Sequence, residues 1–271
     1  MKFNIIICLL SLYILATSCE KIIDVDLNEA NPVPVFEAIL EADSTCRVTA
    51  SFTSSYYDNS TSPPIINASM TITDQLGNSE ILSHEGEGVY RGSSLIGAIG
   101  NTYTLDINLN GALYSANSTM PPLTLIDSCS VQDRGSFFGT GGLPGPTKYF
   151  VYLHYTDPSN LTNYYAVQTT YYDSTDAEYT TDYRIADDQL SNGISTRTFT
   201  TFTSFESGDT VQIELASIDQ PTHLYFKTLE DAIAGAGIAS AAPANPISNF
   251  SEGALGYFSA WSKDEIEFIV P

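Results

Sequence analysis

The chain opens with a largely apolar run from Phe3 to Leu15 and then changes, from residue 31 onward, to short runs in which apolar and polar residues alternate. Alternation with a period of two is typical of β-strands that bury one face. Turn signals such as Asn110-Gly111 separate the runs at short intervals, as they do in β-hairpins. The pattern therefore predicts a mainly β protein that follows an apolar leader.

Residues 31–122 are expected to form an immunoglobulin-like β-sandwich, because their runs are short, β-type and evenly spaced. The expected strands are Val33 to Leu40, Arg47 to Tyr56, Ala68 to Thr73, Glu80 to His84, Gly88 to Arg91, Tyr103 to Asn108 and Ala112 to Ser118. Pro121 and Pro122 end this pattern and mark an expected domain boundary.

Residues 123–271 are expected to form a second, β-rich domain with one helix over residues 221–234, where apolar and aromatic residues can form a helical face. The expected strands are Ser128 to Gln132, Tyr149 to Thr156, Tyr164 to Tyr172, Arg197 to Phe205, Asp209 to Ser217, Gly256 to Trp261 and Glu265 to Val270. Residues 135–146 and 235–249 are rich in Gly, Pro or Ala and are expected to be loops.

Residues 1–18 have the layout of a lipoprotein signal peptide. Lys2 precedes an apolar run that is too short to span a membrane, and small residues stand just before Cys19. We expect the mature chain to begin at Cys19, to carry acyl chains there, and to continue as a tether over residues 19–30. An ordinary secretory signal cut after Ser18 is the alternative. Acyl chains contribute about 0.8 kcal/mol per buried methylene, so more than one chain makes the anchor stable.

Composition and charge narrow the classes of protein. The formal net charge of −22 repels nucleic acid phosphates and argues against a nucleic acid partner. A hydrophobic content of 43% with 11% aromatic residues is too high for a disordered acidic chain. The acidic residues are therefore expected on the solvated surface of a folded protein.

Cys46 and Cys129 are the cysteines left once Cys8 leaves with the signal peptide and Cys19 carries lipid. A disulfide between them would close a loop of roughly 80 residues and contribute about 4 kcal/mol. Two separate buried thiols are the alternative, and the sequence leaves both open.

The sequence offers little catalytic or metal chemistry. His84, His154 and His223 are scattered and have no metal-ligand spacing, and the hydrolase and phosphate-binding motifs are missing from the sequence. We expect no catalytic residue, metal site or cofactor. Acids crowd residues 173–188, where a solvated irregular loop is favoured over a calcium-binding loop.

Aromatic and hydroxyl residues give the remaining candidate sites. Tyr152, Tyr164 and Tyr171 lie in two expected neighbouring strands and are candidate ligand-facing residues, against the alternative that they pair across the sheet. Three Asp-Ser/Thr-x segments resemble a bacterial O-glycosylation pattern. The candidate acceptors there are Ser44, Ser174 and Thr210.

Three segments resemble the signature points of a Bacteroidota lipoprotein family of unknown function. They are Cys19 to Asp26, Ser207 to Val211, and Asn245 to Asn249 with the following Gly253-Ala254-Leu255-Gly256-Tyr257-Phe258. The resemblance covers the whole mature chain. It implies an outer-membrane lipoprotein, often encoded beside a TonB-dependent transporter, and it brings no established chemistry.

The leading hypothesis is a non-enzymatic accessory or binding component of a TonB-dependent transport system. It would be lipid-anchored in the outer membrane, on the periplasmic or the cell-surface face, with a ligand that the sequence does not identify. The alternatives are a surface glycan hydrolase that uses a carboxylate pair, and a structural or adhesive protein of the cell envelope.

Overall fold

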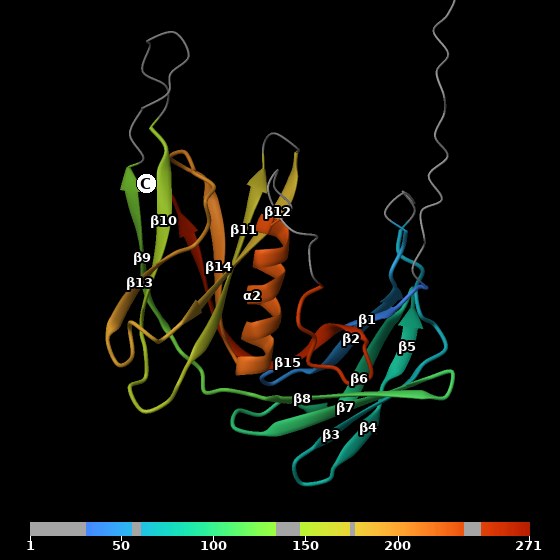
Figure 1. The fold of residues 1–271 in the computed structure, drawn as a ribbon. Helices are drawn as coiled ribbons and strands as arrows, with labels where there is room; N and C mark the ends of the chain where they lie inside the picture. Colours follow the sequence, from blue (N-terminus) through green and yellow to red (C-terminus); the bar gives the residue numbers. More distant parts are fainter. Residues whose placement is uncertain (1–30, 56–60, 134–146, 174–176, 236–244) are drawn as a thin grey trace, which may run out of the picture. The chain divides into compact units, whose positions relative to one another are not determined.

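The computed structural model describes residues 31–55, 61–133, 147–173, 177–235 and 245–271 (Figure 1). Within these ranges the chain is mainly β, and its strands form an eight-stranded, a four-stranded and a three-stranded sheet beside one helix, α2. The expected fold class is therefore confirmed. The expected signal peptide, Cys19, the tether to residue 30, the loop over residues 135–146 and Ser174 lie outside the described residues.

The eight-stranded sheet, called the large sheet below, has the strand order β12-β11-β14-β15-β1-β2-β6-β5. Its strands are β1 (Pro34–Glu41), β2 (Thr45–Phe52), β5 (Ser83–Gly86), β6 (Val89–Ile96), β11 (Tyr164–Asp173), β12 (Glu178–Asp187), β14 (Thr210–Ile218) and β15 (Leu255–Ile269). The first small sheet contains β4 (Ser79–Ile81), β3 (Ser69–Asp74), β7 (Thr102–Leu109) and β8 (Ala112–Thr119), in that order. The second small sheet contains β13 (Ser195–Phe199), β10 (Tyr149–Thr156) and β9 (Ile126–Asp133).

Strand β15 joins the two halves of the large sheet. Residues 255–261 pair in parallel with β1, and residues 262–269 pair antiparallel with β14. The sequence predicts two separate strands here, Gly256 to Trp261 and Glu265 to Val270, whereas the structure joins them into one. Since β15 supplies a neighbour to β1, residues 31–122 do not form a self-contained sandwich, and the boundary expected at residue 122 does not separate two independent sheets.

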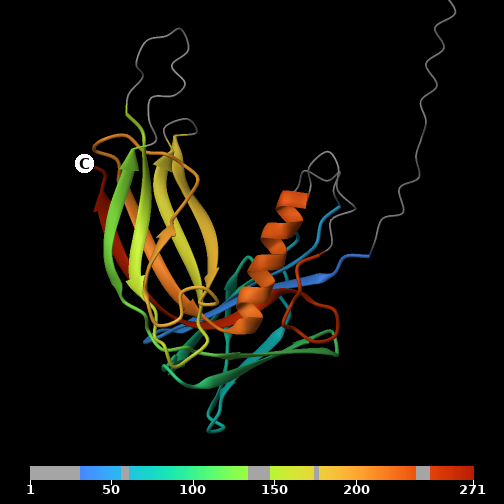
Figure 2. The same ribbon diagram turned by 60° about the vertical axis from the view of Figure 1, so that its left-hand side comes forward.

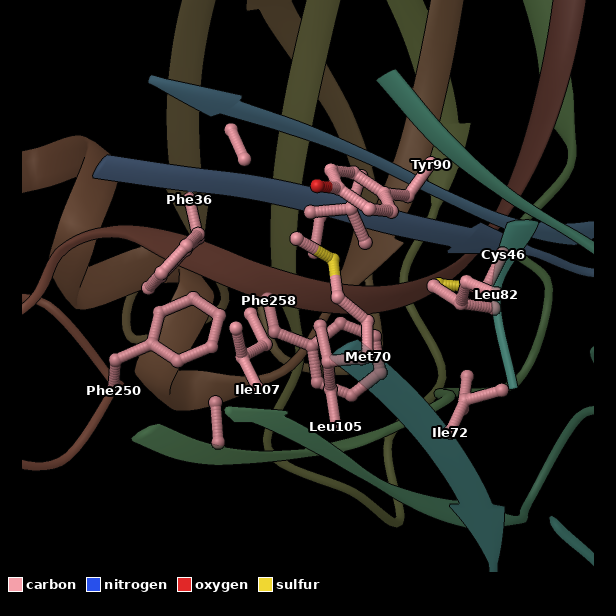
Figure 3. Packing of buried hydrophobic residues seen from close by; sticks show 14 of the residues in the cluster. Phe36, Cys46, Met70, Ile72, Leu82, Tyr90, Leu105, Ile107, Phe250 and Phe258 are labelled. Carbon is pink, nitrogen blue, oxygen red and sulfur yellow. The ribbon is translucent and has the colours of Figure 1, made fainter. Parts of the chain in front are cut away.

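Two hydrophobic cores lie on the same face of the large sheet. Phe258 and Ala260 of β15 enter a core with β1, β2, β3 and β7 (Figure 3), whereas Ile266 and Phe268 pack against a core with β10, β11 and β14. Even-numbered residues of one strand share a face, so each small sheet covers a different part of the same face. The result is two β-sandwiches that share the large sheet.

The helix α2 (Gln220–Gly235) packs against the opposite face of the large sheet (Figures 1 and 2). Asp219 caps its first turn, because one carboxylate oxygen accepts a hydrogen bond from the Thr222 backbone N–H at 3.0 Å. The other oxygen accepts one from the Ser118 hydroxyl at 2.7 Å, which ties the helix to β8. The helix expected over residues 221–234 is confirmed.

Strand β12 corrects the expectation that residues 173–188 form an irregular acidic loop. It pairs with β11 from Asp187 to Glu178 along its whole length. Tyr179, Thr181, Tyr183 and Ile185 stand at every second position of this segment and have high β-propensity. Alternation, not charge, determines the structure of this segment.

Gly256 stands at the closest approach between β15 and β1. It lies opposite Phe36, has a φ of +91°, and a Cβ atom placed on it would lie 2.0 Å from the Phe36 carbonyl oxygen. A side chain is therefore excluded both by the backbone conformation and by the neighbouring strand. The contact with β1 therefore gives a physical reason for glycine at residue 256 of the Gly253-to-Phe258 segment.

Replacing Gly256 by alanine is expected to lower the free energy of unfolding by about 3 kcal/mol or more, because strain at a positive φ adds to a clash with backbone. Gly208→Ala is the matched control, since Gly208 has a φ of +93° with nothing within 4 Å of its Cβ position, and it should cost about 1 kcal/mol. Urea unfolding of both variants measures the difference. Equal losses would show that the β1–β15 contact does not need the glycine.

Glu80 ties β4 of the first small sheet to β6 of the large sheet. Its carboxylate accepts hydrogen bonds from the Ser93 hydroxyl and from the backbone N–H groups of Ser93, Ser94 and Leu95. Partial burial raises the pKa of this carboxyl, but these hydrogen bonds outweigh it and lower the pKa to about 2. The charged form is therefore the one that stabilises the sandwich.

At neutral pH, Glu80→Gln is expected to lower the free energy of unfolding by about 1–2 kcal/mol, because one accepting oxygen becomes an NH2 group that cannot accept and the other becomes a neutral acceptor. A lowered folded pKa means that this stabilisation is complete above the unfolded pKa and is lost as pH falls toward 2. The stability difference from the unmodified protein should thus shrink between about pH 5 and pH 2. Unfolding curves measured across this range test the prediction, with the exposed Glu267→Gln as control. If the stability difference between Glu80→Gln and the unmodified protein stayed constant, the stabilising role of the Glu80 carboxylate would be contradicted.

Candidate functional site

A groove runs between α2 and the outer face of the large sheet, and we call it the aromatic groove. Its cavity volume is about 350 Å³, within the range typical of small-molecule sites. Regular elements supply the walls: β1 and β15 at the base, β12 along one side and α2 along the other. The lining residues are Glu37, Thr181, Asp182, Tyr183, Ile185, Tyr225, Phe226, Leu229, Glu230, Ile233 and Tyr257.

Three packed rings form the floor of the aromatic groove. Tyr257 of β15 lies 4.9 Å, between ring centroids, from both Tyr225 and Phe226 of α2, and all three side chains are buried. Tyr183 of β12 continues the aromatic surface, with its ring nearly parallel to Phe226 at 6.2 Å. Tyr183 is 49% exposed, so it forms a wall that a ligand can reach.

Carboxylates stand around these rings. Glu37 lies directly opposite Tyr257 in the β1–β15 register and is exposed, and Glu230 also lines the aromatic groove. The Asp182 carboxylate lies on the core side of β12, where it accepts hydrogen bonds from the Tyr171 and Thr203 hydroxyls. Burial and the negative charge of Glu37 raise the pKa of Tyr225 and of Tyr257, while burial, Glu214 and Glu37 raise that of Tyr183. The aromatic groove therefore combines ring faces with negative charge.

A second hollow of about 440 Å³ lies at the start of α2 and has a different character. Its lining is mixed, with Asp187 and Lys227 as charges of opposite sign and Tyr164 beside His223 at 4.7 Å between ring centroids. Burial lowers the pKa of His223 and outweighs the opposite effect of Asp187, while Lys227 lowers it further. This hollow has one tyrosine on its wall and no continuous aromatic floor in the described part of the chain.

The three tyrosines chosen from the sequence fall in three different places. Tyr164 is half-buried and lines the second hollow. Tyr171 is 7% exposed and packs in the core of the second sandwich, with its hydroxyl bonded to Thr203 and Asp182, so the expectation that it faces a ligand is wrong. Odd-numbered residues of β11 face that core, whereas Tyr164 is even-numbered.

Tyr152 lies on the outer face of the second small sheet, away from both hollows. The Arg197 guanidinium covers its ring at 3.6 Å from the centroid, and Phe199 lies 5.3 Å away. Phe202, 74% exposed, extends this aromatic surface beyond Phe199. The ring faces are thus occupied by neighbouring side chains, as the alternative of packing within the sheet predicts.

Sequence reasoning missed the residues that build the aromatic groove. Tyr183 lies in a segment that the sequence predicts to be an acidic loop. Glu37 is one polar position of the predicted strand Val33 to Leu40, and Tyr257 is one residue of the predicted strand Gly256 to Trp261. A usable signal was the adjacent pair Tyr225 and Phe226 on an amphipathic helix. Such a pair requires a large apolar surface to pack against.

The candidate disulfide between Cys46 and Cys129 is not formed. Both cysteines are free, and they belong to different cores, since Cys46 lies in the first sandwich and Cys129 packs against the second. Burial, together with the charge of Glu80, raises the pKa of the Cys46 thiol to about 12. Burial raises the pKa of the Cys129 thiol to about 11. Both thiols are therefore poor nucleophiles at neutral pH.

Alkylation of the mature chain in denaturant without reductant is expected to modify both Cys46 and Cys129, as intact mass will show. In the folded protein Cys46 should remain unmodified, because it is fully buried and its thiolate form is scarce. Denatured protein that takes up no alkyl group at these two positions would instead demonstrate a disulfide.

Ser44 and Thr210 stay predicted acceptors of O-linked glycan. Ser44 and Thr210 are exposed and accessible to a modifying enzyme. Among the residues that the structure describes, no three His, Cys, Asp or Glu side chains are grouped to hold a metal ion. No helix of the described ranges has the length and apolar character needed to cross a membrane.

Comparison with known proteins places the chain in a family. No curated protein matches the sequence. Residues 20–267, which include every wall of the aromatic groove, match the family described as a domain of unknown function (DUF4249). The chain therefore belongs to this family.

Proposed function

We propose that this protein is an outer-membrane lipoprotein of Bacteroidota that binds a ligand as a non-enzymatic component of a TonB-dependent transport system. The observation that carries the proposal is the aromatic groove, because it offers an exposed ring wall, a buried aromatic floor and a few polar groups on rigid elements. Binding sites for small ligands share this composition.

The lipid anchor of the proposal rests on the sequence. Cys19 would carry the acyl chains, and the tether over residues 19–30 would connect them to the folded part that begins with β1. Two or more acyl chains suffice for stable attachment. Anchored in this way, the protein would present its groove beside a transporter in the same membrane.

The side chains that line the aromatic groove are held on rigid elements, which favours ligand binding. Glu37, Tyr183 and Tyr257 stand on strands of one hydrogen-bonded sheet, and Phe226 is fixed by its ring contacts with two of these strands. A site on regular elements holds its side chains in place before the ligand arrives, which reduces the entropy cost of binding.

The experiment is affinity purification of the tagged protein from native membranes, compared with its Cys19→Ala variant. We expect a TonB-dependent transporter to co-purify with the unmodified protein. We expect Cys19→Ala to leave the membrane fraction and to lose acyl label, because the variant has no thiol to carry lipid. Cys129→Ala is the matched control and should keep both properties.

Three results would count against the proposal. Recovery of the tagged protein from native membranes without any transporter would contradict the transport role. Acyl label that persists in Cys19→Ala would show that Cys19 does not carry the lipid. Glycan cleavage that disappears in Glu37→Gln or Glu230→Gln would replace binding by hydrolysis at the same groove.

A further inference from the structure

The charges that line the aromatic groove have one sign. Glu37 and Glu230 are acidic, and no Lys, Arg or His of the described residues joins them. The Asp182 carboxylate does not contribute here, because it is bonded to Tyr171 and Thr203 on the core side of β12. Neither Glu37 nor Glu230 makes an ion pair within the described ranges, although Lys263 does so nearby with Glu41 and Glu214. These two carboxylates are therefore left without a compensating cation from the described part of the protein.

The ring faces add to the negative potential. An aromatic ring carries partial negative charge on its face and attracts a cation placed over it. Tyr183 presents a half-exposed ring at the wall, and the floor of Tyr225, Phe226 and Tyr257 lies beneath. Because Glu37 stands opposite Tyr257 in the strand register, one carboxylate and several rings converge on the same space.

Resting on the proposed binding function, we propose that the ligand of the aromatic groove is a small organic cation with an alkylammonium head group. Such a group has apolar alkyl surface for the rings and positive charge for Glu37 and Glu230. A neutral sugar would leave these carboxylates uncompensated, and an anion would be repelled. The volume of about 350 Å³ fits one head group with a short chain.

The proposed alkylammonium ligand also fits the side chains at the edge of the aromatic groove. Ile185 on β12 and Leu229 and Ile233 on α2 supply aliphatic surface next to the rings, and Ile233 is 70% exposed. An alkyl chain attached to the ammonium group would lie along these side chains. Selectivity then comes from charge at the head group and from apolar contact along the chain.

Isothermal titration calorimetry with the full mature protein tests the inference, using choline and n-butylammonium as probes. The neutral matched probe for choline is 3,3-dimethylbutan-1-ol, which keeps the shape of the head group and removes its charge. We expect saturable binding of the two cations. We expect binding of the alcohol to be weaker by about tenfold or more, because it loses the cation–π and carboxylate attraction.

Two substitutions assign the binding to the groove. Glu37→Gln should weaken choline binding by about threefold to tenfold at low salt, and Tyr183→Leu should also weaken it, because the exposed ring wall is removed. Glu267→Gln is the matched control, since Glu267 is an exposed carboxylate of β15 outside the groove lining. Circular dichroism and melting curves confirm that each variant is folded.

The outcomes separate this inference from the proposed function. Equal affinity for choline and the alcohol, no saturable binding of either cation, or cation binding unaffected by Glu37→Gln would each overturn the cationic ligand. If a neutral saccharide binds instead and Tyr183→Leu abolishes its binding, the groove remains a binding site and only the ligand class is wrong. A protein that co-purifies with no transporter and binds none of these probes would lose both proposals.

Discussion

The hydrogen bonding of β15 to two different partners is the constraint on which this fold depends. One half of the strand is bonded to β1 and the other half to β14, so a single segment belongs to both sandwiches. Lys263 lies just beyond the change of partner and pairs with Glu41 of β1 and Glu214 of β14. Burial lowers the pKa of Lys263, but its hydrogen bond to Glu214 and the surrounding carboxylates outweigh this and raise it.

The two faces of β15 have different roles. Its even-numbered apolar residues, from Phe258 to Phe268, enter the hydrophobic cores, whereas Tyr257 and Trp261 on the other face contact residues beneath or beside α2. Because Asp219 ties the start of α2 to Ser118, the helix is fixed at one end by a hydrogen bond and in its first half by the packing of Tyr225 and Phe226 on the sheet. The aromatic groove is the space that this arrangement leaves between the helix and β12.

Local patterns in the sequence predicted most of the local structure. The helix at Gln220–Gly235 and strands such as Tyr149–Thr156 followed from periodicity, because those segments bury one face and expose the other. Long-range pairing could not be read in the same way. Nothing local to Leu255 says that its neighbour is Val35, and the hydrogen bonds between strands leave no signature in either segment.

The candidate site shows the same limit more strongly. Glu37, Tyr183, Phe226 and Tyr257 come from four separate elements, and each one alone has an ordinary structural explanation. Tyr171 was misplaced because two tyrosines of one strand can face opposite sides of a sheet. The candidate disulfide between Cys46 and Cys129 is wrong for a related reason. Spacing along the chain does not reveal that the two residues occupy different cores.

The pairing of β1 with β15 also has a consequence for the order of folding. Glu41 and Trp261, which are hydrogen-bonded, are 220 residues apart in the chain. Contacts of such high sequence separation slow folding, because a large loop must close before they form. The first sandwich therefore cannot be completed until the last strand is available.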